Sequence, residues 1–193
     1  QILIEHPEVE AVQIAVNYFD WNARLVQAEA CYDVIRRHGR QVIIMEPVKG
    51  GMLSDVPDSV EKLLRAEHPD WSPAAWALRF TASLDGVLAV LSGMSSPAQV
   101  EENVSTMGDT RPLTEEERSI LAQAARLYRE AGPAGTGDFT PYETINPRGI
   151  SAAVILDTYN SCMLQPDPTF GAEHNYFSAE KAKHGLHEND RCI

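Results

Sequence analysis

The sequence predicts an α/β protein built around a parallel β-sheet, and two observations support this prediction. Three apolar runs, at residues 10–18, 41–46 and 87–92, have the length of buried strands. Segments with the apolar spacing of helices separate these runs along the chain. Strands that are apolar on both faces and alternate with helices are typical of a parallel sheet, in a (β/α) barrel or in a doubly wound fold.

The first two strands and the helix between them follow from residue types. The run EAVQIAVNY is short and rich in β-branched residues, which predicts a strand over residues 10–18. Apolar residues then recur at helical spacing over residues 23–38, and Gly39 is placed to end that helix. The run QVIIMEP predicts the second strand, over residues 41–46, which Pro47 stops.

The third strand follows a helical region in two pieces. Residues 60–84 have helical spacing, and the stretch WSPAAW marks the start of the second piece. Ser72 is placed as the N-cap, and Pro73 occupies the first helical position. The run GVLAVLSG then predicts a strand over residues 87–92.

Two more helices are predicted after the third strand. One covers residues 96–104, and the other runs through the segment TEEERSILAQAARLYREAG. In the second of these, Thr114 and Glu117 have the spacing of a capping box.

Composition excludes several classes of function. The chain has 193 residues, 44% of them hydrophobic, and a formal net charge of -12, without any run of lysines or arginines. This charge disfavours a nucleic-acid or anionic-membrane partner. No stretch resembles a membrane span or a signal peptide, so we expect a cytoplasmic protein. The three cysteines are too scattered for a disulfide framework, and the six histidines do not have the spacing of a zinc site. Cys31 is expected to be buried in a helix.

The turn after the third predicted strand has the features of an anion site. In the stretch VLSGMSSPAQVEEN, Ser96 as N-cap places Pro97 first in the helix and Gln99 third, as in a capping box. The N-H groups at such a helix start, together with Gly93 and the Ser95 hydroxyl, can bind a phosphate. The local pattern alone is equally typical of a good helix start.

Four stretches, QIAVNYFDW, IIMEPVKGGMLS, WSPAAWALRF and VLSGMSSPAQVEEN, together resemble the aldo/keto reductase family. The stretch QIAVNYFDW resembles the strand of that family that binds the nicotinamide amide, and IIMEPVKGGMLS resembles its next strand and cofactor-covering loop. WSPAAWALRF resembles the helix before the last strand, and VLSGMSSPAQVEEN the last strand with its helix. The similarity covers roughly residues 5–131 in order. It implies the C-terminal portion of a (β/α)8 TIM barrel, with about three parallel strands and their helices.

The resemblance implies a set of cofactor-binding residues for NADP or NAD. It places Gln13 at the nicotinamide amide and Met45 where the family often stacks an aromatic ring. The other implied contacts run from the pyrophosphate to the adenine: Gly50, Gly51, Leu53, Gly93, Ser95, Ser96, Gln99, Glu102 and Asn103. The family often has Lys and Arg where Gly93 and Gln99 stand here, so the choice of NADP over NAD stays open.

No catalytic residue is assigned. The reaction implied by the resemblance is hydride transfer between a nicotinamide and a small carbonyl substrate, which needs a proton donor. The family takes that donor, a tyrosine with its lysine, aspartate and histidine partners, from earlier strands, so we expect a longer parent protein and an inactive fragment. Tyr18 and Lys49 are not assigned as substitutes. Two alternatives stay open, a non-catalytic nucleotide-sensing or adaptor barrel and another phosphate-binding (β/α) barrel enzyme.

The chain is expected to have three parts. Residues 1–131 form the barrel portion, residues 132–149 read as a linker rich in Gly, Pro and Thr, and residues 150–193 as a helical extension. One branch of the family carries a C-terminal ferredoxin-like extension, and the segment DRCI resembles its start. Cys192 is therefore the candidate metal ligand, the first of a 4Fe-4S cluster completed beyond Ile193 in the parent.

Overall fold

The computed structural model describes residues 1–23, 26–109 and 111–131. Its strands are β1 (Ala11–Ala15), β2 (Gln41–Met45) and β3 (Val87–Val90). Its helices are α1 (Ile2–Glu5), α2 (Ala28–Arg37), the 3-10 turn η1 (Lys49–Gly51), α3 (Asp58–Glu67), α4 (Pro73–Ala82), α5 (Pro97–Gly108) and α6 (Glu115–Glu130). The predicted linker 132–149, the extension 150–193 and Cys192 lie outside the described residues.

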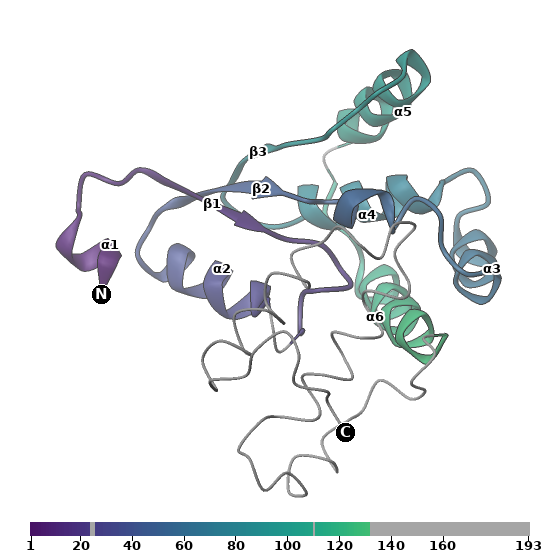
Figure 1. The fold of residues 1–193 in the computed structure, drawn as a ribbon, viewed down its shortest axis with the longest axis horizontal. Coiled ribbons are helices and arrows are strands. Elements are labelled where there is room, and N and C mark those ends of the chain that lie inside the picture. Colours follow the sequence, from purple (N-terminus) through teal and green to yellow (C-terminus); the bar gives the residue numbers. More distant parts are fainter. Residues whose placement is uncertain (24–25, 110, 132–193) are drawn as a thin grey trace, which may run out of the picture. The chain divides into compact units, whose positions relative to one another are not determined.

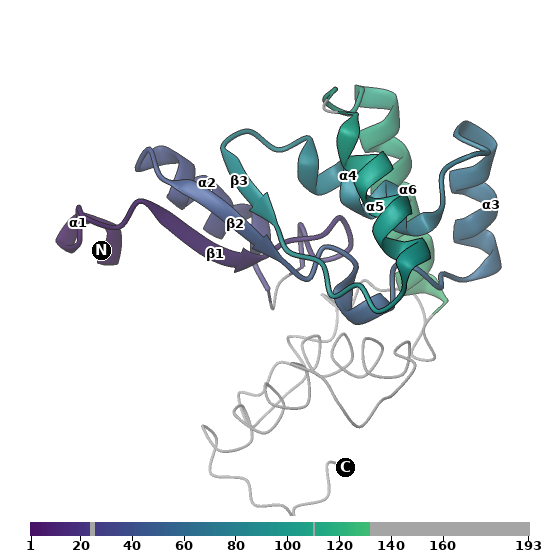
Figure 2. The same cartoon turned by 90° about the horizontal axis from the view of Figure 1, so that it is seen from above.

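The three strands form one parallel sheet in the order β1-β2-β3 (Figure 1; Figure 2). Ala11 pairs with Gln41 at the start of the β1-β2 ladder, and Val42 pairs with Val87 at the start of the β2-β3 ladder. A register shift follows Val42. The prediction of three parallel strands that alternate with helices is confirmed, in agreement with part of a (β/α)8 barrel.

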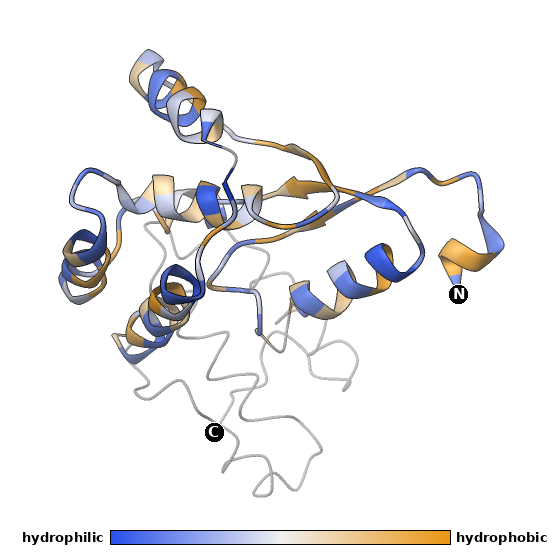
Figure 3. Cartoon of the chain, turned by 180° about the vertical axis from the view of Figure 1, so that it is seen from behind, coloured by the Kyte–Doolittle hydropathy of each residue, from blue (hydrophilic) through white to orange (hydrophobic). Residues whose placement is uncertain are grey.

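The core lies between the sheet and the helices. Val42 and Ile44 of β2 are fully buried, and Ala28 and Ile35 of α2 are buried as well. Helix α4 is apolar on nearly all sides, which suits its position inside the fold, where it is buried from Ala75 to Thr81. The three strands are the most hydrophobic part of the described chain (Figure 3). None of the described helices has the length and apolarity needed to cross a membrane.

Helix starts follow the predicted caps. The Ser72 hydroxyl accepts a hydrogen bond from the Ala75 N-H at 3.0 Å, with Pro73 first in α4. Ser96 and Gln99 form the predicted capping box at the start of α5. Thr114 and Glu117 cap each other in the same way before α6, with bonds of 2.7 and 3.2 Å. These bonds satisfy backbone N-H groups that have no partner inside a helix.

Cys31 corrects one expectation, because it is exposed. Helix α2 turns Ala28 and Ile35 toward the sheet, and these two positions are two helical turns apart on one face. Cys31 lies outside that narrow stripe.

Glu117 is the centre of a buried network that joins the end of α3 to the start of α6. Arg111 donates to both of its carboxylate oxygens, at 2.7 and 2.9 Å, and His68 Nε2 lies 2.8 Å from Oε1. The His68 ring stacks on Trp71 with 4.1 Å between the ring centroids. The Arg111 hydrogen bonds, with smaller contributions from the Thr114 N-H and His68, lower the pKa of Glu117 to about 2, although burial opposes the shift.

Candidate functional site

A groove of about 790 Å³ opens beyond the carboxyl ends of β2 and β3. One wall is the loop that follows β2, through Glu46, Pro47, Val48, Gly50 and Gly51. The other wall is the turn after β3 and the first turns of α5, through Ser92, Gly93, Ser95, Gln99, Glu102 and Asn103. Ligands of parallel α/β sheets bind at this end of the strands.

The groove brings together many of the predicted cofactor residues. Gly50 and Gly51 lie on one wall, while Gly93, Ser95, Gln99, Glu102 and Asn103 lie on the other. These residues come from segments more than 40 positions apart, so the sequence order alone does not bring them close.

Four predicted residues do not line this groove. Gln13 on β1 donates from Nε2 to the sulfur of Met45 on β2 at 3.3 Å, so these two contact each other. Leu53 is fully buried, and its N-H donates to the Val48 carbonyl at 3.1 Å. Ser96 serves as the N-cap of α5. A cofactor role for these four stays a prediction.

The Gln99 side chain occupies the donors at the start of α5. Its Oε1 accepts from the Ser95 N-H at 2.7 Å and from the Ser96 N-H at 3.3 Å, and the Ser95 hydroxyl lies 3.3 Å away. A carboxamide oxygen thus sits where an anion oxygen would be expected at a helix N-terminus. Asn103 Nδ2 donates to the Ser92 hydroxyl at 3.1 Å and ties α5 to the turn.

The charge of the groove is negative on its described surface. Glu46 and Glu102 line it, and none of its described lining residues is Lys or Arg. Any anion bound there has to be held by backbone N-H groups and hydroxyls. The N-H groups of Gly93 and Met94 are suited to this, because they donate to no other described residue.

A cluster of buried polar side chains contacts the loop that forms the first wall of the groove. Asn17 Nδ2 donates to the Glu46 carbonyl at 3.2 Å and to Asp20 Oδ2 at 3.0 Å, and the Asp20 N-H donates to Asn17 Oδ1 at 2.8 Å. Lys49 Nζ donates to both Asp20 oxygens, at 2.9 and 3.0 Å. The Lys49 and Asp20 side chains are only 8% and 5% exposed.

Sequence reasoning missed this cluster. Asn17 and Asp20 lie shortly after the carboxyl end of β1, and polar residues at that end of a parallel strand point to the functional edge of the sheet. That signal was available. The pairing of Asp20 with Lys49, 29 residues later, could not be predicted, since it depends on how β1 and β2 pair.

Comparisons with known proteins give one family and a set of similar solved structures, two of which are described below. Residues 1–126 match the model of the aldo/keto reductase family. The holo and apo structures of the aldo-keto reductase AKR11C1 from Bacillus halodurans are each 27% identical to the chain, with a TM-score of 0.49. They match 64% of this chain, which spans 46% and 47% of theirs, so it covers less than half of their length. No curated protein matches the chain.

Proposed function

Because the chain belongs to the aldo/keto reductase family, we propose that the groove holds a nicotinamide dinucleotide, NAD or NADP, for an oxidoreductase that acts on small carbonyl compounds. The observation that carries the proposal is the pair of walls. A Gly-Gly loop and a helix N-terminus face the same space at the carboxyl ends of parallel strands.

The residues of the groove fit a dinucleotide phosphate in shape. A side chain at Gly50, Gly51 or Gly93 would meet no atom within 4 Å, so open space lies beside the backbone at all three positions. A phosphate can therefore approach the main chain closely there and accept from N-H groups such as those of Gly93 and Met94. The volume of about 790 Å³ is within the range of small-molecule sites.

The family resemblance assigns the ends of the dinucleotide, and the side-chain chemistry suits that assignment. Glu102 accepts from an exocyclic amine, and Asn103 offers a donor and an acceptor, which suits the adenine. Gln13 and Met45 would meet the nicotinamide, where the Gln13 amide now donates to the sulfur. When bound, the dinucleotide supplies the hydride. Its orientation is the task of these residues, and we assign none of them to proton transfer.

We also propose an iron-sulfur cluster in a longer parent protein. Cys192 as a ligand of a 4Fe-4S cluster in a longer parent is supported by the sequence resemblance alone, because Cys192 lies outside the described residues. Within the described part of the chain, no group of three or more His, Cys, Asp or Glu side chains could hold a metal ion.

A single charge in the groove tests the proposal. Gly93→Asp places a carboxylate where a side chain has free space, so the fold accepts it. We expect NADH affinity to fall at least about tenfold, because the carboxylate repels the dinucleotide phosphates. Titration of the purified chain with NADH, followed by energy transfer from its tryptophans, measures this. Gly108→Asp is the matched control, since Gly108 also has free space but lies outside the groove. The absence of saturable NADH binding, or equal affinity in both variants, contradicts the proposal.

The same titration with NADPH reports on the choice of cofactor. We expect NADH to bind more tightly, because NADPH brings a further phosphate to a groove that is lined by Glu46 and Glu102 and, among its described residues, by no cation. Adding a cation near the helix start, in Gln99→Arg, should shift the preference toward NADPH. Tighter binding of NADPH than of NADH by the unmodified chain would show that the negative charge of the groove does not determine the cofactor preference.

A further inference from the structure

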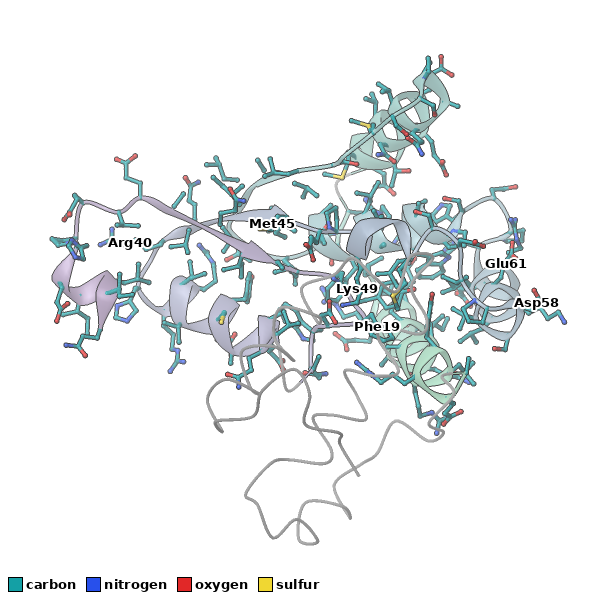
Figure 4. The ribbon with its side chains drawn as sticks, in the orientation of Figure 1. Phe19, Arg40, Met45, Lys49, Asp58 and Glu61 are labelled. Carbon is teal, nitrogen blue, oxygen red and sulfur yellow. The ribbon has the colours of Figure 1, made fainter. Side chains whose placement is uncertain are left out.

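The loop wall of the groove has one residue that does not line it. Glu46, Pro47, Val48, Gly50 and Gly51 all line the groove. The Lys49 side chain instead reaches Asp20, at 2.9 Å, in a nearly solvent-free position. Its ammonium also lies 5.6 Å from the centre of the Phe19 ring, and Figure 4 shows the two side chains close together. This lysine is therefore engaged with Asp20 and is not part of the groove lining.

The backbone of the wall is strained at two places. Glu46 and Lys49 have φ angles of 54° and 48°, the left-handed region that residues with a side chain seldom adopt. Among the described residues, only Gln27 shares this feature without being glycine. Such a strained backbone conformation persists only where surrounding contacts stabilise it. It is found most often at functional sites.

Two side chains of one segment contact both strained residues. Asn17 Nδ2 donates to the carbonyl of Glu46 at 3.2 Å, and Asp20 accepts from the ammonium of Lys49. Asn17 and Asp20 are themselves joined by two hydrogen bonds, of 2.8 and 3.0 Å, and both are buried. Both strained residues of the wall are thus tied to the same rigid pair.

We propose that Asn17, Asp20 and Lys49 are positioning residues that hold the 46–51 loop in the left-handed conformation that shapes the groove for its dinucleotide. The part of this proposal that concerns the dinucleotide rests on the proposed function. The ion pair acts through the backbone of the loop, because the Lys49 side chain is paired with Asp20 and does not line the groove. Its burial makes the attraction stronger than a surface pair would provide, and the hydrogen bonds from Asn17 stabilise the carboxylate.

Two double variants separate the conformation of residue 49 from its charge. Asp20→Asn/Lys49→Ala and Asp20→Asn/Lys49→Gly both remove the ion pair without leaving a buried charge behind. Alanine resists the left-handed conformation at residue 49, whereas glycine adopts it freely. We expect the alanine variant to bind NADH about tenfold more weakly than the unmodified chain, and the glycine variant to recover several-fold of that loss. A purely structural role of the pair would affect both variants alike.

Hydrogen exchange gives a readout that needs no ligand. The N-H groups of Gly51, Met52, Leu53 and Ser54 donate within the loop, so they report directly on its order. We expect their exchange to be at least about tenfold faster in the alanine variant. Glu61→Gln/Arg65→Ala is the matched control, because it removes an exposed ion pair of α3 at 2.8 Å. It should leave both the exchange and the NADH affinity unchanged.

The outcomes distinguish the two proposals. Unchanged exchange in the alanine variant, or equal NADH affinity in the alanine and glycine variants, overturns the positioning role. If the unmodified chain binds no dinucleotide but exchange of the loop still rises, the proposed function fails while the support of the loop by the ion pair stands.

Discussion

Glu117→Ala is expected to lower the free energy of unfolding by about 3 kcal/mol. The Glu117 side chain is 3% exposed and accepts hydrogen bonds from Arg111, His68 and the Thr114 N-H. Its removal takes the carboxylate acceptor away from Arg111, from the part-buried His68 ring and from the Thr114 N-H. Arg111 is 42% exposed and can turn to water, which keeps the loss at the low end for a buried pair. Urea denaturation followed by tryptophan fluorescence measures the change.

Glu116→Ala provides the control for this prediction. Glu116 is the preceding residue of the same helical turn but is exposed, so its replacement should change stability by less than about 1 kcal/mol. A loss in Glu117→Ala as small as in the control would mean that the network contributes little to the fold.

Lowering the pH should remove the stability that the Glu117 carboxylate contributes to the fold, over a defined pH range. The Arg111 hydrogen bonds chiefly depress the pKa of Glu117, from 4.5 to about 2 in the folded chain. A carboxylate with a depressed pKa stabilises the fold above its unfolded value, and that stability is lost as the pH falls toward the folded value. We expect a loss of about 3 kcal/mol between pH 4.5 and pH 2, measured as the urea midpoint at a series of pH values.

Glu117→Gln isolates this residue from the other carboxylates. The variant has no proton to gain, so its stability should fall less steeply than that of the unmodified chain below pH 4.5. Parallel pH profiles of the two proteins would assign the acid sensitivity to other groups.

Local signals in the sequence predicted the elements that depend on local physics. Ser72 with Pro73, and Ser96 with Gln99, mark helix starts because the capping bonds join residues three positions apart. The strands were identified from their β-branched runs, and their parallel order from the helices between them. The ends of the strands were predicted too far out by a few residues, since apolar pattern continues beyond the last ladder bonds.

The tertiary contacts of the site were not predictable in the same way. The ion pair of Asp20 and Lys49 joins residues 29 positions apart, and its geometry depends on the pairing of two strands. The exposed position of Cys31 depends on the rotation of α2 about its own axis, and residue type alone does not place a cysteine inside or outside the buried face. The groove residues were predicted to lie together only through the family resemblance. A resemblance to a family of known fold contains three-dimensional information that the local sequence pattern lacks.

The carboxamide of Gln99 competes with any ligand for the backbone N-H donors at the start of α5. Its oxygen accepts from the Ser95 and Ser96 N-H groups, so a ligand that uses these donors has first to displace it. The measured affinity of such a ligand is its intrinsic affinity multiplied by the fraction of molecules in which the side chain has turned away. The same side chain, on returning, occupies the donors as the ligand leaves. A ligand that uses these two donors therefore binds more weakly than it would if the Gln99 side chain were absent from them.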